Sequence, residues 1–308
     1  MCPVRATEQH KKKPCASNTH SILLVNSLLD HTKNISSPRS ADPIAGSTQE
    51  RRRAQYELLR TLVHRELRGR YRDSILGSSW TILQPLLMTV IYYFIFGLLF
   101  NTSAIPNYAL FVLVGIILWN FFATAIPQGT GSLVGNADII RKVWFRRELI
   151  PMSIVIAASF STAVLLILVT PLCIYANHDV AKTFWLAPFF FVLLMSMTLG
   201  LTTILAVANV FFRDIAHLVG VILLPLFFLT PVFYSLSALP VVPPDWVIML
   251  LRYGNPLTPY LETLRALLFE GAIPGWPLIV YCVVVGPTLS FVGIWFLRHR
   301  DSSLAVEL

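Results

Sequence analysis

The feature that most constrains this chain is an apolar stretch without a single charge, which runs from Trp80 to Phe100. A helix of these 21 residues is about 30 Å long, which is the thickness of the hydrocarbon core of a bilayer. Six stretches of this kind occur, and none contains Asp, Glu, Lys, Arg or His: residues 80–100, 109–127, 150–175, 184–212, 218–236 and 277–297. The pattern predicts an all-α polytopic membrane protein with six transmembrane helices.

Composition supports this class and argues against others. The chain is 55% hydrophobic and only 13% charged, whereas soluble domains carry about 25% charged residues. The net charge of +8 does not indicate nucleic-acid binding, because the basic residues lie between apolar stretches rather than on one polar domain. The four cysteines lack metal or redox spacing, and no catalytic carboxylate pair or Ser/His/Asp set stands near a span. The spans also lack the ionisable residue that proton-coupled carriers usually keep.

Positive charge predicts which connections face the cytoplasm. With a cytoplasmic N terminus, the connections from Arg51 onward place 15 Lys and Arg inside and 3 outside. The positive-inside rule therefore predicts a multi-pass protein of the cytoplasmic membrane with both termini inside. The other connections expected inside are residues 128–148 and Arg213. Those expected outside are residues 101–108, 176–183 and 237–276.

The segment before the first span has the pattern of a basic amphipathic helix. One row of residues is apolar and the neighbouring row is basic: Leu59, Val63, Leu67 and Tyr71 in the first, and Arg60, His64, Arg68 and Arg72 in the second. Such a helix suits the membrane surface, with its arginines near lipid phosphates. Gly77 and two serines are expected to break it before the first span. A simple lipid-anchoring flank is the alternative.

Residues 237–276 depart from the spanning pattern because they contain six prolines. Thr258 followed by Pro259 is a typical helix start, and Gly271 is a typical stop. A helix of about 11 residues between these two signals covers only about 16 Å and cannot cross a bilayer. We therefore expect short outer helices that lie at the surface or dip in and return.

The loop after the second span predicts a short cytoplasmic helix. Asn136 is placed to cap it, Asp138 suits its positive end, and Arg141 lies toward its negative end. Its apolar residues are expected to be exposed and to fill a groove on a partner: Ile139, Ile140, Val143 and Phe145. A helix lying on lipid headgroups is the alternative. The chain has no GxxxxGK[ST] loop to bind nucleotide phosphates.

Aromatic residues concentrate in the first, second and fifth spans. Rings stack on the apolar faces of sugars, and Tyr and Trp add a hydrogen bond. The candidates for contact with a glycan are Tyr92, Phe96, Trp119, Phe228 and Tyr234. Packing and lipid-facing belts are the alternative reading of each ring.

Four stretches carry a resemblance to a known family: RELRGRYRDSILGSSWTILQPLLM, NADIIRKVWFRRELIP, FFRDIAHLVGVILLPLFFLTPVFY and NPLTPYLETLRALLFEG. Together they resemble ABC-2-type exporter permeases, in the branch that exports lipid-linked polysaccharides and teichoic acids, over about residues 55–300. The resemblance implies that the helix at Asn136–Phe145 docks on an ATPase subunit. It also implies that Arg213 and Asp214 act at a gate, and that two short outer helices dip between the last two spans.

The function that the resemblance implies is the transmembrane half of an ATP-driven exporter. The chain would form a homodimer that pairs with two copies of a separate ATPase, and ATP and Mg²⁺ would bind there, leaving this chain without a cofactor. The expected substrate is a polyprenyl-linked glycan such as an O-antigen, a galactan or a teichoic acid, with Arg68, Arg70 and Arg72 meeting its anionic headgroup. An exporter of small hydrophobic drugs or lipids, and a membrane anchor for a cytoplasmic enzyme, are the alternatives.

The N-terminal residues 1–50 differ from the rest of the chain. They are polar, with three consecutive lysines from Lys11 and scattered Ser and Asn. This composition predicts a mostly disordered cytoplasmic tail ahead of a transmembrane domain at 51–308. The alternative is an incorrectly chosen start codon, because the family-like part begins near Arg51.

Overall fold

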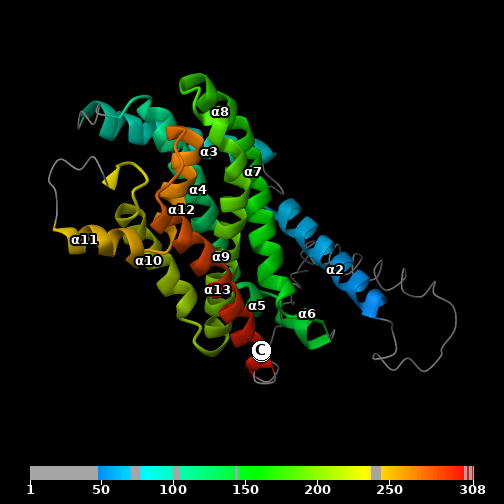
Figure 1. The fold of residues 1–308 in the computed structure, drawn as a ribbon. Helices are drawn as coiled ribbons and strands as arrows, with labels where there is room; N and C mark the ends of the chain where they lie inside the picture. The colour runs from blue at the N-terminus through cyan, green and yellow to red at the C-terminus, as the bar shows by residue number, and fades with distance from the viewer. Residues whose placement is uncertain are drawn as a thin grey trace, which may run out of the picture. The chain divides into compact units, whose positions relative to one another are not determined.

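The computed structural model describes residues 48–70, 77–99, 105–142, 145–236 and 244–301, together with 304 and 307 (Figure 1). These residues form helices and no strands, which confirms the all-α prediction within the described part. The chain divides into two compact units, Met1–Arg51 and Arg52–Leu308, and the helices discussed below belong to the second. The tail predicted for residues 1–50 lies outside the described residues except at its last three positions.

Five helical segments are long and apolar enough to cross a membrane. They are α3 (Trp80–Tyr92) continued by the π-helix η2 (Tyr93–Leu99), α4 (Tyr108–Thr130), α7 (Leu149–Ala176), α9 (Ala187–Phe211) preceded by α8 (Val180–Thr183) and η3 (Phe184–Leu186), and α13 (Trp276–His299). These segments coincide with five of the six predicted spans. Their uniform apolarity leaves no polar face, as expected of helices surrounded by protein and lipid.

The remaining predicted span, residues 218–236, is shorter than expected. Helix α10 covers Ile215–Leu229, and its 15 residues reach only about 22 Å. The helix ends because Thr230 takes an extended backbone conformation and Pro231 follows it. Residues 230–236 form a turn instead of a last helical stretch, and the prediction of a sixth helix of full span length is therefore wrong.

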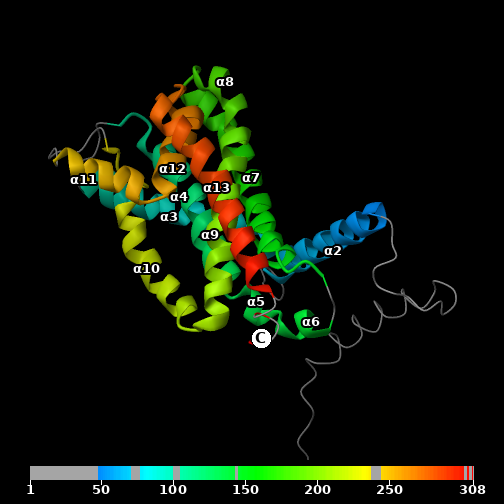
Figure 2. The same cartoon turned by 60° about the horizontal axis from the view of Figure 1, so that its bottom comes forward.

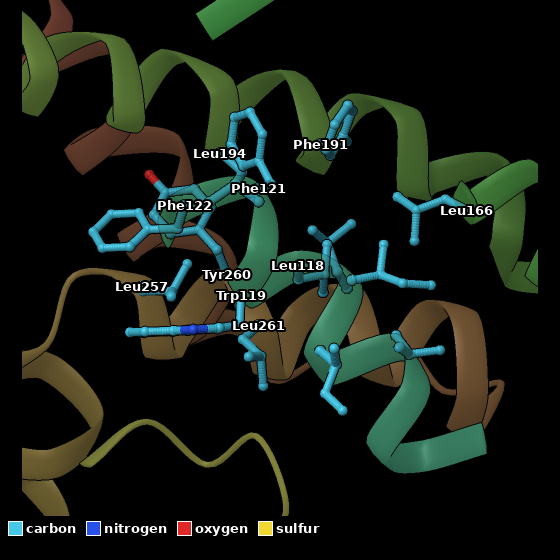
Figure 3. Packing of buried hydrophobic residues seen from close by; sticks show 14 of the residues in the cluster. Leu118, Trp119, Phe121, Phe122, Leu166, Phe191, Leu194, Leu257, Tyr260 and Leu261 are labelled. Carbon is cyan, nitrogen blue, oxygen red and sulfur yellow. The ribbon is translucent and has the colours of Figure 1, made fainter. Parts of the chain in front are cut away.

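The core of the helical unit is built around α4, α9 and α12 (Leu257–Arg265) (Figure 3). Phe121 and Phe122 of α4 lie between Leu194 of α9 and Tyr260 of α12, and all four side chains are almost fully buried. Because interior atoms pack at crystal-like density, the core sets the positions of these helices closely.

Helices α9 and α13 cross at small residues. A Cβ atom on Gly200 would overlap the backbone of Leu289, and one on Gly293 would stand 2.6 Å from the Gly200 carbonyl oxygen. Beside this crossing, the Ser196 hydroxyl donates to the Ser290 hydroxyl at 3.0 Å. Close backbone approach through small residues is the usual way in which membrane helices associate.

The connections of the bundle gather at two opposite ends (Figure 2). At one end, Leu133 of α5 (Ser132–Gly135) and Ile140 of α6 (Ala137–Lys142) pack with Leu297, near the end of α13. At the other end, Asn177 Nδ2 donates to the Glu270 carbonyl oxygen at 2.8 Å, and Thr183 Oγ1 donates to the Leu267 carbonyl oxygen at 2.8 Å. The predicted topology requires this grouping, since it places residues 128–148 and the C terminus together and residues 176–183 opposite them.

The proline-rich region forms two short helices with π-type ends: α11 (Asp245–Met249) with η5 (Leu250–Gly254), and α12 with η6 (Ala266–Glu270). Tyr260 donates its hydroxyl to the Cys282 carbonyl oxygen at 2.9 Å and would touch a Cβ on Gly286. Gly286 lies ten residues into α13, or about 15 Å from its start. Helix α12 therefore packs beside the first half of α13, which is the arrangement expected of a re-entrant helix. It ends at the predicted stop, because Gly271 adopts a φ of 69°.

Candidate functional site

The predicted aromatic residues of the first, second and fifth spans lie in one cluster. Two further rings join the candidates for contact with a glycan: Phe233 stands 4.3 Å from Phe96, and Phe227 stands 5.5 Å from Tyr92 and 5.1 Å from Trp119, measured between ring centroids. We call the following set the aromatic cluster: Tyr92, Phe96, Trp119, Phe227, Phe228, Phe233 and Tyr234. Helical spacing alone does not show that three separate spans converge here.

A cavity of about 280 Å³ opens beside this cluster. Tyr92, Trp119 and Phe227 line it together with the amide side chain of Asn120. Trp119 and Phe227 are buried, whereas Phe228 is 52% exposed, so only part of the cluster is available to a ligand. The cavity offers apolar ring surfaces with one hydrogen-bonding amide, a combination that suits sugar units.

The aromatic cluster is held by the turn at residues 230–236. Tyr108 donates its hydroxyl to the Phe233 carbonyl oxygen at 2.6 Å, and Asn255 Nδ2 donates to Thr230 Oγ1 at 2.7 Å. These bonds join α4 and the loop before α12 to the turn. They set the direction in which Phe233 and Tyr234 leave the backbone.

Arg265 of α12 is the most deeply placed cation of the described region. It is 3% exposed, and its Nη1 and Nη2 atoms donate to the carbonyl oxygens of Pro231 and Val232 at 2.7 and 2.8 Å. The guanidinium also lies 3.7 Å from the centroid of the Phe111 ring. Gly115 of α4 leaves room for it, because a Cβ there would overlap the guanidinium. The charge count treats Arg265 only as one of the three basic residues expected outside. The available signal is its place, with Glu262, in the otherwise largely apolar stretch Tyr260–Phe269.

Two of the three predicted headgroup arginines, Arg68 and Arg70, lie within the described residues. Arg68 is exposed in the last turn of α2 (Thr48–Gly69), and Arg72 lies outside the described residues. Arg70 is half-buried and donates Nη2 to Gln128 Oε1 at 3.1 Å. It lines a small cavity of about 70 Å³ with Gln84, Asn120, Thr124 and Ser161. Arg70 therefore faces polar groups of three helices, while a role in headgroup binding stays a prediction.

Asn120 lines both the Arg70 cavity and the aromatic cavity. A third cavity, of about 250 Å³, includes Phe111 of the same helix and Arg265. Phe111, Asn120 and Gln128 cover about 26 Å of α4, which is most of a bilayer core. An arginine, aromatic rings and a polar cavity thus follow one another along α4.

The short helix predicted after the second span exists as α6, but its start differs from the prediction. The Asn136 carbonyl oxygen accepts the amide protons of Ile139 and Ile140 at 3.1 Å. Its side chain does not cap α6: Nδ2 donates to the Ser132 carbonyl oxygen at 2.8 Å, and Oδ1 accepts from Arg65 Nη2 at 2.8 Å. Asn136 thus ties α6 directly to the basic helix α2.

The apolar residues of this loop are less exposed than predicted. Ile140 is 8% exposed and belongs to the core at this end, and Phe145 packs against the same core. The prediction that Ile140 is available to a partner is wrong, because the ends of α9 and α13 already cover it. Asp138 and Arg141 are exposed, and Ile139 and Phe145 are half-buried. Val143 lies outside the described residues.

Arg213 and Asp214 are exposed in the connection between α9 and α10. The turn is shaped by Asn209, whose Oδ1 accepts the amide proton of Ala216 at 3.0 Å. No ion pair joins Arg213 or Asp214 to the basic helix within the described residues. A gating role for the two residues stays a prediction.

The apolar helices, the re-entrant α12 and the cavities along α4 define a multi-pass membrane transport protein. The family model for ABC-2 type transporters matches residues 57–269. The chain belongs to this family.

Named relatives extend the likeness along most of the chain. It is 33% identical over 253 residues to the O-antigen export system permease protein RfbA of Myxococcus xanthus, which covers 82% of this chain and 95% of the relative. It is 30% identical over 240 residues to RfbA of Klebsiella pneumoniae, covering 78% and 90%. It is also 23% identical over 246 residues to the polysialic acid transport protein KpsM of Escherichia coli, covering 78% and 92%.

Proposed function

We propose that this chain is the transmembrane subunit of an ATP-driven exporter that moves a lipid-linked polysaccharide across the cytoplasmic membrane, with both termini in the cytoplasm. The observation that carries the proposal is the order of cavities along α4. Arg70 stands at one cavity, the aromatic cluster at the next, and a polar cavity with Arg265 at the third. The names of the relatives, O-antigen export and polysialic acid transport, support the same substrate class.

The aromatic cluster suits a polymer of sugars better than a fixed small ligand. Ring faces hold sugars through apolar contact with few directional bonds, so successive units can exchange at one place. A channel must bind its cargo well enough to admit it and weakly enough to release it. The apolar surfaces and single amide of the aromatic cavity meet both requirements.

The partners in this proposal are a second copy of the chain and two ATPase subunits. A two-fold axis between identical subunits creates a path that neither subunit forms alone. ATP and Mg²⁺ would bind to the ATPase, because this chain lacks a phosphate-binding loop of the P-loop type. We expect movement of the ATPase to reach the bundle through α6, and the bond between Arg65 and Asn136 to carry it to α2.

The first prediction tests the substrate class. Deleting the gene is expected to remove one surface polysaccharide and to leave its lipid-linked form inside the cell, because the polymer is made but not moved. Immunoblots of intact and lysed cells measure the two pools. Re-expression of the chain should restore the surface pool. An unchanged surface polysaccharide, combined with lost drug resistance, would point to a small-molecule exporter instead.

The second prediction concerns the partner surface of α6. Ile139→Asp is expected to leave the permease in the membrane but to reduce co-purification of the ATPase at least about tenfold, because a charge would enter an apolar groove. Ile139→Leu is the matched control and should keep the partner bound. Equal recovery of the ATPase with both variants would place the contact elsewhere.

The third prediction concerns Arg68, Arg70 and Arg72. Replacing all three with lysine retains the positive charge that orients the chain but removes the planar fork that holds two phosphate oxygens. The variant is expected to insert normally and to export poorly, about tenfold less polymer per inserted permease. Export at the parental rate would show that the arginines act only as topological anchors.

A further inference from the structure

The third cavity along α4 is lined by charged side chains, a kind of residue that the predicted spans lack. It lies among α12, the turn after α10 and the connection into α13. Its lining includes one aromatic residue, one serine and four charged residues: Phe111, Ser235, Arg252, Glu262, Arg265 and Glu270. Glu262 and Arg265 belong to the re-entrant helix, which lies beside the first half of α13. Charged groups at this depth are costly and mark functional sites more often than structural ones.

Hydrogen bonding in this cavity is incomplete. Arg265 is 3% exposed, and although both Nη atoms donate to carbonyl oxygens, its Nε has no hydrogen-bond partner among the described residues. Arg252 Nε lies 3.0 Å from Glu262 Oε2 in an ion pair that crosses from η5 to α12. A buried donor without a partner costs free energy in a native protein, so Arg265 is held here at a cost to stability.

The cavity adjoins the aromatic cluster through one short turn. Residues 230–236 place Phe233 and Tyr234 in the cluster and Pro231, Ser235 and Leu236 in the cavity wall. Arg265 binds the backbone of this turn directly. An exported polymer that passes the aromatic cluster and moves toward η6 therefore meets this cavity next.

We propose that this cavity binds one neutral hexose unit of the exported polymer. Hexose hydroxyls both donate and accept, and the cavity offers carboxylate acceptors and a guanidinium donor. Two arginines and two glutamates give no net charge, so the site favours an uncharged sugar over an acidic one. Its volume of about 250 Å³ admits one sugar ring, and is several times the roughly 30 Å³ share of a water molecule. The assignment rests on the proposed function.

The test is sugar binding to the permease–ATPase complex in phospholipid nanodiscs. Saturation-transfer difference NMR is recorded with glucose, galactose and mannose, and with N-acetylneuraminic acid as the acidic comparison. Two variants address the cavity: Glu262→Gln removes a charged acceptor, and Ala272→Trp fills the exposed mouth without touching the buried core. Ala181→Trp, exposed on α8 at the same end of the bundle, is the matched control.

We expect at least one hexose to give a signal with the parent and the Ala181→Trp variant, and the signal to fall about tenfold in both cavity variants. Equal signals in all four proteins, no signal above empty nanodiscs, a loss in Glu262→Gln alone, or an equal response to the acidic sugar would overturn the proposal. Polymer export by the parent is measured separately. Export without a hexose signal refutes only the proposal that this cavity binds a hexose. A hexose signal without polysaccharide export refutes the proposed function.

Discussion

Gly200→Val is expected to abolish the folded permease. The Gly200 Cβ position overlaps the backbone of Leu289 and Ser290 on α13, and backbone atoms cannot move aside as a flexible side chain does. Helices α9 and α13 would have to separate along their crossing, which also brings the Gly200 carbonyl oxygen close to Gly293. Overpacking of a well-filled core costs about 1–3 kcal/mol even where side chains adjust, and more is expected where backbone meets backbone.

Gly220→Val is the matched control for this variant. Gly220 lies in α10, and a Cβ there meets nothing within 4 Å, so the substitution should leave the protein intact. The measurement is the fraction of membrane-inserted protein that survives detergent extraction and elutes as one peak in size exclusion. Recovery of Gly200→Val at the level of Gly220→Val would mean that the two helices do not cross at Gly200.

Arg265→Ala is expected to destabilise the re-entrant helix and to stop export. The substitution leaves the Pro231 and Val232 carbonyl oxygens without their donors and removes the contact with the Phe111 ring. Leaving a buried carbonyl oxygen without its donor costs about 1–3 kcal/mol, and two are affected here, so the total is a large fraction of the stability of a typical domain. The turn at residues 230–236 would lose two of the hydrogen bonds that hold it, and the aromatic cluster would be less well positioned.

Two comparisons separate this effect from a general loss of charge. Arg298→Ala removes the exposed ion pair with Glu148, at 2.8 Å, and surface pairs contribute only about 0–1 kcal/mol. Arg265→Lys keeps the charge but cannot bridge two carbonyl oxygens in one plane, and should therefore resemble the alanine variant more than the parent. Thermal unfolding in detergent and export per inserted permease are measured together. An Arg265→Ala variant as stable as Arg298→Ala would show that the hydrogen bonds from Arg265 to the Pro231 and Val232 carbonyl oxygens have no structural role.

The two predictions concern different kinds of contact. Gly200 matters because the backbone of α13 occupies the place where its side chain would stand. Arg265 matters because its guanidinium donates hydrogen bonds to two backbone carbonyl oxygens, and no other side chain among the described residues supplies these donors when it is removed. Both contacts join segments distant in the sequence, so local patterns do not reveal them.

The sequence by itself determined the approximate positions of the five long apolar helices of the described region, although it predicted a sixth. Uncharged runs such as 80–100 must satisfy their backbone within one segment when they enter a bilayer, so length and apolarity alone predict a spanning helix. Gly271 was recognised as a helix stop for a similarly local reason, the left-handed conformation that glycine adopts without strain. The family, too, was apparent from four short stretches, and the family model confirms it.

Only the tertiary structure decided which residues meet. Apolar periodicity cannot say that Ile140 is covered by α9 and α13, because every face of an apolar helix has the same pattern. Asn136 was expected to cap its own helix, but the neighbouring Arg65 competes for its side chain. The charge count treats Arg265 only as an outer charge, whereas the structure places it against α4 and the turn at residues 230–236. Such contacts depend on how the helices are placed in space, and local propensity carries no information about that placement.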